Sequence, residues 1–362
     1  MHYGHMWSHC VDCSNRFSET TLTLSPLRRC IQFWSQEVIE QLIQGNKPVP
    51  PKMAAKTKVV VLDGGSGFSL VEAGHKEIEK DPLWSALLVK TQPQAIVDLH
   101  KQFYRSGADI VVTATYQASI EGYVKKFGMT QSEAADVVTE GINLAKQARH
   151  QMQSESGRKC WVAGSVGPYG ATLCDMSEYH GKYAEKMTSQ ELTEWHSRRL
   201  AAIVKGQPDI LAVETIPVVK EAEAILESLK SFPESRAWVS FQCKDEAHTG
   251  HGEKLSDAIR TSLQSDNVIA VGVNCTNANY ITPLLKSLSH LDIKVPILVK
   301  PNKGGLSGEA PATTSLDEKA PEWIQHGATW LGGCCYYGPR DIASLRHFLD
   351  SQPELELSGP TL

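Results

Sequence analysis

Short apolar runs and longer stretches of helical character alternate along the chain from residue 58 onward. The short runs are apolar throughout, which predicts strands that are buried on both faces. The predicted strands are 58–63, 109–115, 160–166, 210–214, 237–242, 268–274, 295–299 and 329–333. The predicted helices, one after each strand, are 94–107, 131–153, 189–205, 221–231, 254–265, 280–290, 316–327 and 340–350.

Eight strands that alternate with helices predict an α/β protein, a parallel (β/α)8 barrel of the TIM type. The main alternative is an open, doubly wound sheet. Against that alternative, the glycine-rich turn Asp63-Gly-Gly-Ser-Gly67 lacks the GxGxxG spacing of a dinucleotide-binding fold. We therefore favour the barrel.

The chain divides into a poorly ordered N-terminal extension (1–56), the barrel (57–352) and a C-terminal tail (353–362). The extension holds one Cys10-x-x-Cys13 pair with histidines nearby, but no second pair at the spacing of a zinc finger. Its arginines suggest a transit peptide, although it carries more acidic residues than such peptides usually do. We expect it to have no part in the chemistry.

Composition narrows the possible partners. A net charge of −5 and a pI near 6.2 give no reason to expect nucleic acid or an anionic membrane surface as a partner. No apolar stretch approaches the roughly 20 residues that span a bilayer. The 9 cysteines are an odd number and no secretory signal precedes them, so we expect a reducing, cytoplasmic location. The oligomeric state stays open.

Three cysteines stand at the ends of predicted strands. Cys275 ends the sixth strand, and Cys334 and Cys335 end the eighth, behind two glycines that permit unusual backbone dihedrals. In a barrel the active site lies at the carboxyl ends of the strands, so these three thiols should meet there. Three thiolates with no fourth protein ligand predict an open Zn²⁺ site, with one position for a substrate.

Several motifs carry a resemblance to a known family. The chain resembles the homocysteine S-methyltransferases, zinc-dependent barrels that methylate a thiol, over residues 58–349. The Asp-Pro-Leu-Trp-Ser stretch is closer to the branch that uses S-methylmethionine or S-adenosylmethionine than to the betaine-using branch. The motifs are Leu62-Asp-Gly-Gly65, Asp81-Pro-Leu-Trp-Ser-Ala86, Gly107-Ala-Asp-Ile110, Thr113-Ala-Thr-Tyr-Gln117, Ala163-Gly-Ser-Val-Gly-Pro168, Glu214-Thr215, Val273-Asn-Cys275 and Gly332-Gly-Cys-Cys335.

The resemblance implies homocysteine and a sulfonium methyl donor as substrates, with methionine as product. It implies that Asp63 and Glu214 hold the amino group of homocysteine. Backbone N–H groups at Gly64 and Gly65 are candidates for its carboxylate, and Gln117 and Asn274 are further candidates for polar contacts. Trp84 either lines the donor pocket or packs a helix against the barrel.

The chain departs from the family at two places. Lys300-Pro-Asn-Lys-Gly304 stands where the family usually has Tyr-Pro-Asn-Ser-Gly, which adds two cations near the pocket. Met176 stands where the family tends to have glycine.

Alternative functions remain open beside this one. Betaine is an alternative donor. A zinc hydrolase would hold water in the open position, but an all-thiolate ligand set makes the metal a poor Lewis acid. A non-catalytic zinc- or thiol-binding barrel is the third alternative, and Lys300 and Lys303 are its best support. Cys160, Cys174 and Cys243 are expected to be core residues.

Overall fold

The computed structural model describes residues 55–303 and 314–362. Residues 56–362 form one compact unit. The hypotheses on the N-terminal extension, including the Cys10 and Cys13 pair, lie outside the described residues apart from its last two positions. In the part that is described, no helix is long and apolar enough to cross a membrane.

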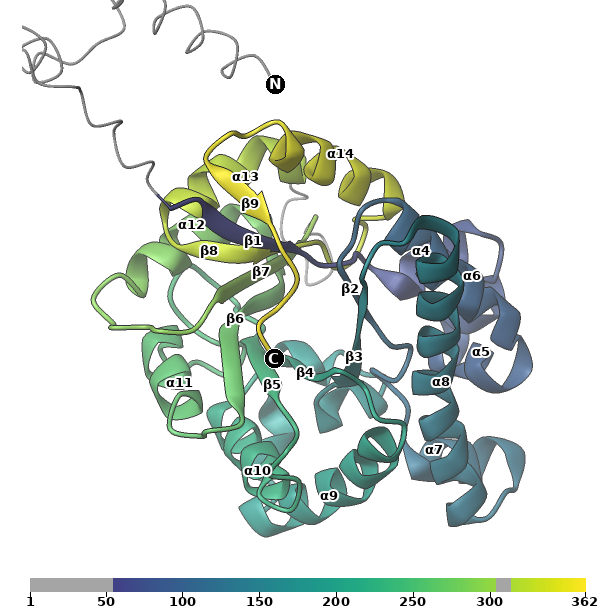
Figure 1. Ribbon diagram of the computed structural model, residues 1–362. Coiled ribbons are helices and arrows are strands. Elements are labelled where there is room, and N and C mark those ends of the chain that lie inside the picture. Colours follow the sequence, from purple (N-terminus) through teal and green to yellow (C-terminus); the bar gives the residue numbers. More distant parts are fainter. Residues whose placement is uncertain (1–54, 304–313) are drawn as a thin grey trace, which may run out of the picture. The chain divides into compact units, whose positions relative to one another are not determined.

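Nine parallel strands form one sheet in the order β2-β3-β4-β5-β6-β7-β8-β1-β9 (Figure 1). All eight predicted strands are confirmed, with ends that move by a few residues. The strands are β1 (Thr57–Val61), β2 (Ile110–Val112), β3 (Trp161–Val166), β4 (Ile210–Ile216), β5 (Ala237–Phe241), β6 (Val268–Asn277), β7 (Ile297–Asn302), β8 (Ala328–Leu331) and β9 (Leu355–Leu357).

The sheet curls so that β1 approaches β2. An isolated parallel bridge joins Leu62 to Ile110, and the Asp109 N–H donates to the carbonyl oxygen of Val61 at 2.6 Å. Trp238 on β5 and Trp330 on β8 meet edge to face, with ring centroids 6.0 Å apart. Because β5 and β8 are not neighbours in the sheet, this ring contact crosses its concave side.

The eight predicted helices are also confirmed, and Figure 1 shows them around the outside of the strands. They are α6 (Pro93–Arg105), α8 (Gln131–Ser156), α9 (Ser189–Lys205), α10 (Val219–Leu229), α11 (Leu255–Ser262), α12 (Ala278–Ser287), α13 (Leu316–Gln325) and α14 (Pro339–Asp350). The structure adds three shorter helices, α4 (Ser66–Glu72), α5 (Ala86–Thr91) and α7 (Ile120–Phe127). Capping boxes start α8 at Thr130 and α9 at Thr188.

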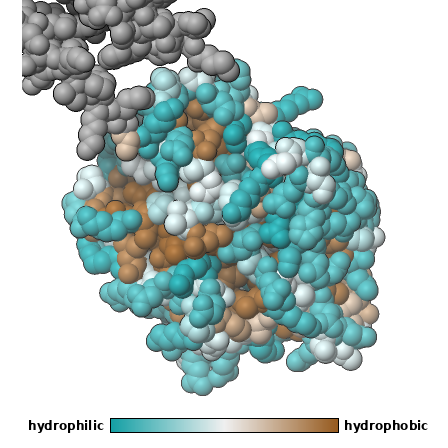
Figure 2. All heavy atoms as spheres, in the orientation of Figure 1, coloured by the Kyte–Doolittle hydropathy of each residue, from teal (hydrophilic) through white to brown (hydrophobic). Residues whose placement is uncertain are grey.

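The core has two layers because successive side chains of a strand point to opposite faces. Val59 and Val61 of β1 belong to the layer between sheet and helices, whereas Val60 and Leu62 belong to the layer inside the curl. This double burial explains why the strand runs are apolar at every position. Hydrophilic side chains cover much of the outer helices, while hydrophobic residues gather nearer the strands (Figure 2).

The predicted C-terminal tail (353–362) contains a strand that the sequence pattern does not indicate. Residues 355–357 pair with β1, and the Ser358 N–H donates to the carbonyl oxygen of Val59. A Cβ atom at Gly359 would lie 1.8 Å from the Trp161 ring, at the start of β3. The tail therefore packs at the amino ends of the strands, opposite the candidate site, and Figure 1 shows the C-terminus amid the strands.

Candidate metal centre and substrate pocket

A cavity of about 470 Å³ opens at the carboxyl ends of the strands. Its wall includes residues from the ends of β2, β4, β6 and β7 and from the turns after β1 and β8. The sequence predicts the active site on this same face. Of the eight predicted site residues, six line the cavity: Gly64, Gln117, Glu214, Cys275, Cys334 and Cys335.

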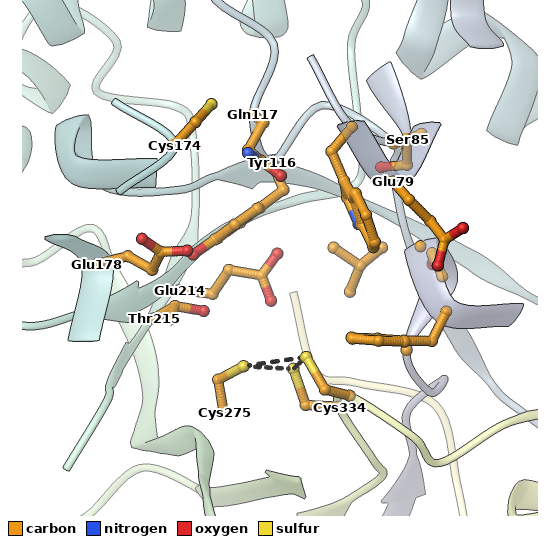
Figure 3. Close-up of a pocket in the computed structure, with 18 of the residues that line it drawn as sticks. Glu79, Ser85, Tyr116, Gln117, Cys174, Glu178, Glu214, Thr215, Cys275 and Cys334 are labelled. Carbon is orange, nitrogen blue, oxygen red and sulfur yellow. Dashed lines mark hydrogen bonds between the residues drawn. The ribbon is translucent and has the colours of Figure 1, made fainter. Parts of the chain in front are cut away.

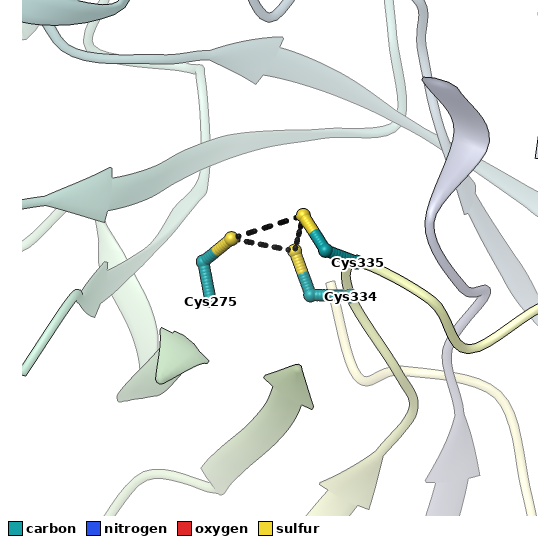
Figure 4. A group of neighbouring side chains, drawn as sticks. All are labelled: Cys275, Cys334 and Cys335. Atoms are coloured by element: carbon teal, nitrogen blue, oxygen red, sulfur yellow. Dashed lines mark hydrogen bonds between the residues drawn. The ribbon is translucent and has the colours of Figure 1, made fainter. Parts of the chain in front are cut away.

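The three predicted cysteines form one cluster on the cavity wall (Figure 4). The Cys275 sulfur lies 3.1 Å from that of Cys334 and 3.5 Å from that of Cys335, and the Cys334 and Cys335 sulfurs are 4.0 Å apart. These distances are far longer than the roughly 2.05 Å of a disulfide. A regular tetrahedral ion with bonds of about 2.3 Å would space its sulfurs about 3.8 Å apart. The cluster therefore suits a metal ion, which these three thiolates would hold on the cavity wall.

Local backbone features hold the cluster together. Cys275 has a positive φ of 49° where the pairing of β6 with β7 shifts register. Gly332 and Gly333, by contrast, have no positive φ. These two glycines serve close packing: a Cβ at Gly332 would lie 2.7 Å from the Asp63 carbonyl oxygen, and one at Gly333 would lie 2.4 Å from Tyr337.

Glu214 presents a carboxylate to the cavity from the end of β4. Figure 3 shows it in the same part of the cavity as the sulfurs of Cys275 and Cys334. One carboxylate oxygen accepts a hydrogen bond from the Ser165 hydroxyl. Burial raises the pKa of Glu214 to about 7. This group can therefore hold a cation, or take up a proton near neutral pH.

Asp63 lies behind the cavity wall rather than on it. Its side chain is fully buried. One oxygen accepts from the Val112 N–H at 2.7 Å and the other from the Lys300 ammonium at 2.7 Å. The predicted contact of Asp63 with a substrate ammonium group therefore stays a prediction, and the structure shows Lys300 in the place of that ammonium group.

Of the two added lysines, one lines the cavity and one does not. Lys300 is only 4% exposed and pairs with Asp63. Burial lowers the pKa of Lys300, but the carboxylates of Asp63 and Glu214 outweigh burial and raise that pKa above its ordinary value. Lys303 is 36% exposed and pairs with Asp341 at 3.1 Å. Of the two added lysines, Lys300 is therefore the one that places a cation at the cavity.

Asn274 also lies away from the cavity wall. Its side-chain oxygen Oδ1 accepts hydrogen bonds from the Thr215 N–H at 2.6 Å and from the Ser240 hydroxyl at 2.8 Å. Its side-chain nitrogen Nδ2 donates to the Thr215 hydroxyl at 2.7 Å. Thr215 has a positive φ of 60°. These bonds give Asn274 a role in holding the turn beside Glu214, while direct contact with substrate stays a prediction.

The two remaining predicted contacts meet the cavity differently. The Gln117 amide donates to the Ala171 carbonyl oxygen at 2.9 Å, which fixes the side chain on the cavity wall. Gly64 has no room for a side chain, because a Cβ there would lie 2.2 Å from the Tyr337 carbonyl oxygen. The Gly65 N–H donates to that same oxygen at 2.8 Å, so it is not available to a substrate carboxylate.

Aromatic side chains form another part of the cavity wall. Phe68 and Trp84 line it, with ring centroids 5.6 Å apart, and Tyr336 packs on Phe68 at 4.1 Å. The Trp84 indole also covers Gly67, so this residue both lines the pocket and packs against α4. Met176 has a positive φ of 66°, which explains why the family tends to have glycine there.

Cys174, expected in the core, is instead exposed and lies on this wall, and Tyr116, Glu178 and Tyr179 are among the wall residues that were not assigned a role from the sequence. The Tyr179 hydroxyl lies 3.4 Å from the Cys275 sulfur. Burial raises the pKa of Glu178 to about 7, and Figure 3 shows this side chain beside the Tyr116 ring. Tyr116 stands within the quoted motif Thr113-Ala-Thr-Tyr-Gln117, which is the signal that could have identified it, whereas no quoted motif contains Glu178 or Tyr179.

Arg199 of α9 supports this wall from behind, and its replacement is the first testable prediction. It is 2% exposed, and its guanidinium donates to the carbonyl oxygens of Gly167, Thr115 and Tyr116. Arg199→Met leaves these carbonyl groups without their donor, so we expect a loss of about 3 kcal/mol in the free energy of unfolding. Urea denaturation measures it.

The neighbouring residue gives a matched control. Arg198 makes an exposed ion pair with Glu121 at 2.8 Å, so Arg198→Met should change the free energy of unfolding by less than about 0.5 kcal/mol. Equal urea midpoints for the two variants would contradict the role assigned to Arg199.

Comparison with known proteins agrees with this geometry. The family model described as homocysteine S-methyltransferase matches residues 60–349. The chain is 37% identical over 312 residues to a betaine-homocysteine S-methyltransferase of Drosophila melanogaster, covering 81% of this chain and 94% of that protein. It is 36% identical over 299 residues to homocysteine S-methyltransferase YbgG of Bacillus subtilis (strain 168), covering 79% and 93%.

A solved structure gives the same result. The metallated form of the homocysteine methyltransferase MmuM from Escherichia coli superposes with a TM-score of 0.72 at 34% identity, covering 80% of this chain and 96% of that one. The match spans the part of the chain that carries the cysteine cluster and the cavity. This chain belongs to the homocysteine S-methyltransferase family.

Proposed function

We propose that this protein is a zinc-dependent methyltransferase that moves a methyl group from a sulfonium donor to the thiolate of homocysteine and so forms methionine. The cysteine cluster carries the proposal: three sulfurs within 4.8 Å of one another on the wall of a cavity large enough for two small substrates. A closed (β/α)8 barrel is part of the proposal, and the bridge between Leu62 and Ile110 supports it.

Zinc suits this ligand set because soft thiolate ligands favour it over the harder divalent ions. When bound by Cys275, Cys334 and Cys335, it would keep the acceptor sulfur deprotonated at neutral pH, where a free thiol with a pKa near 8.5 is mostly protonated. Because the three thiols must stay reduced, a reducing compartment such as the cytoplasm fits the proposal.

The side chains around the cluster would orient the two substrates. Glu214 would hold the ammonium group of the acceptor beside the sulfurs, and its burial would strengthen that contact. Phe68 and Trp84 would face the cationic donor, since aromatic rings attract sulfonium and quaternary ammonium groups. Methyl transfer from a sulfonium releases a neutral thioether, so the leaving group needs no general acid, and positioning supplies much of the rate.

Betaine is the second candidate donor, and one relative in Drosophila melanogaster is named for it. The aromatic rings fit either cation. Carboxylates on the same wall, Glu79 and Glu178, favour S-methylmethionine or S-adenosylmethionine, because these donors carry a primary ammonium group besides the sulfonium, whereas the quaternary ammonium group is the only cation of betaine.

A methyl-transfer assay with homocysteine and each donor in turn tests the proposal. Zinc-loaded protein should form methionine from S-methylmethionine or S-adenosylmethionine, with at least about tenfold lower kcat/KM for betaine, the effect of one lost ionic contact. A preference for betaine would overturn the donor assignment but keep the acceptor. No methionine from any of the three donors would favour the non-catalytic barrel.

A further inference from the structure

Lys300 presents an ammonium group at the cavity that is only partly engaged. It lies near the end of β7, and within the described part of the chain its single hydrogen bond goes to Asp63. A lysine ammonium has three N–H donors. Since Lys300 lines the cavity, its other donors can serve a bound molecule.

Glu214 is similarly half engaged. Ser165 donates to one of its oxygens. Its second oxygen makes no hydrogen bond in residues 55–303 and 314–362, although the carboxylate points into the cavity (Figure 3). The charges of Lys300 and Glu214 act on each other and on Cys334, so both groups lie near the cysteine cluster, with the buried Asp63 carboxylate paired to Lys300.

We propose that Lys300 binds the carboxylate of the acceptor whose ammonium group Glu214 would hold, while Asp63 holds Lys300 in place. The inference rests on the proposed function and names how its acceptor is recognised. A zwitterionic α-amino acid with a thiol side chain offers one anion and one cation, which match the charges of Lys300 and Glu214. In this arrangement Asp63 is a positioning residue.

The surroundings of Asp63 argue against its direct contact with the acceptor's ammonium group. Both of its oxygens already accept hydrogen bonds, and the side chain is fully buried. An ammonium group that approached it would meet the ammonium of Lys300, and like charges at such distances repel.

Titration calorimetry tests the proposal. It measures how three thiols bind to the zinc-loaded protein in the absence of any methyl donor. Homocysteine carries both charges, 4-mercaptobutyrate lacks the ammonium group, and 3-aminopropanethiol lacks the carboxylate. For Lys300→Met we expect the affinities for homocysteine and 4-mercaptobutyrate to fall about 10- to 100-fold, as for the loss of a charge-assisted hydrogen bond. The affinity for 3-aminopropanethiol should not fall.

Lys303→Met is the matched control. This lysine lies three residues further on, pairs with Asp341 and does not line the cavity. It should leave all three affinities within about twofold, because the effect of an exposed ion pair is small. A fall in 4-mercaptobutyrate affinity equal to that of Lys300→Met would overturn the specific role of Lys300.

Asp63→Asn separates the two possible roles of the carboxylate. If Asp63 only positions Lys300, the variant weakens the carboxylate-bearing thiols and leaves 3-aminopropanethiol within about threefold. If Asp63 itself holds the ammonium group, 3-aminopropanethiol weakens and 4-mercaptobutyrate does not, which overturns the proposal.

Lys300→Met leaves a buried carboxylate without its cation and can fail to fold. The double variant Lys300→Met/Asp63→Asn removes both charges and should give the same binding pattern as Lys300→Met. An unchanged affinity of the double variant for 4-mercaptobutyrate would overturn the proposal. Because no donor is present, these results stand even where the methyl-transfer assay fails.

Discussion

Cys334→Ala is expected to abolish methyl transfer to homocysteine. The substitution removes one of three sulfurs that lie within 4.8 Å of one another and leaves two protein ligands. Loss of an outer-shell partner already costs 10- to 100-fold in metal affinity or activity, so loss of a ligand should lower kcat/KM by more than about 100-fold. Bound zinc, measured by elemental analysis after gel filtration, should fall in parallel.

Cys160→Ala provides the control for this experiment. Cys160 is buried in the outer core layer and contributes no sulfur to the cluster. Its replacement should keep a full complement of zinc and at least about half the activity, at a cost of about 1 kcal/mol in the free energy of unfolding. Full zinc content and activity in Cys334→Ala would contradict the assignment of the metal centre.

The cysteine cluster could be predicted from sequence because two rules apply to the same residues: strand ends share one face of the fold, and clustered thiols bind metal ions. A (β/α)8 pattern brings the carboxyl ends of strands to one face, and Cys275 and Cys334 stand at such ends. Neither rule needs side-chain detail. The same reasoning located Glu214 on the cavity wall.

The role of Asp63 depends on its contact with Lys300, which the pattern of strands and helices does not indicate. Asp63 and Lys300 are 237 residues apart, and nothing local indicates that they pair. The same holds for Asn274, whose partners Thr215 and Ser240 belong to other segments. Strand-end position predicts that a polar residue faces the site, but its neighbours decide whether it has hydrogen-bonding capacity left for a ligand.

Strand β9 shows a different limit. Its three residues, Leu355–Leu357, are too few to form a distinct apolar run. They become a strand because the edge of β1 lies beside them, and the following Gly359 fits against Trp161. Tertiary contact, rather than local propensity, forms this element.

Glu214→Gln is expected to lower the methyl-transfer activity and to raise the free energy of unfolding. In the parent protein, activity should rise with pH below 7, while the free energy of unfolding should fall. Burial raises the pKa of Glu214 to about 7 in the folded protein, from an ordinary value of 4.5. The free protein must ionise this group before it can bind an ammonium group, so kcat/KM for homocysteine should fall about tenfold per pH unit below 7. Glu214→Gln should remove this acid limb and lower kcat/KM at pH 8 about 10- to 100-fold.

A second carboxyl group titrates in the same range, so the assignment needs a comparison. Burial also raises the pKa of Glu178 to about 7, but Glu178 lies on the cavity wall beside Tyr116 rather than beside the cysteine sulfurs. Glu178→Gln should therefore keep the acid limb in kcat/KM for homocysteine. If the limb disappears in Glu178→Gln and persists in Glu214→Gln, the group that controls acceptor binding is Glu178.

The stability of Glu214→Gln follows from the same pKa with the opposite sign. Because the folded-state pKa is the higher one, the folded protein binds the extra proton between pH 4.5 and 7, and the free energy of unfolding falls as pH rises through that window. Glutamine imitates the neutral acid at every pH, so the variant should match the parent near pH 4.5 and exceed it at pH 8 by up to about 3 kcal/mol. Urea denaturation at both pH values measures the difference. A variant that is no more stable than the parent at pH 8 would contradict the raised pKa of Glu214, since the effect of Lys300 is already part of that value. A more stable but inactive variant would show that the site keeps an ionised carboxylate at the expense of stability, for the sake of binding its substrate.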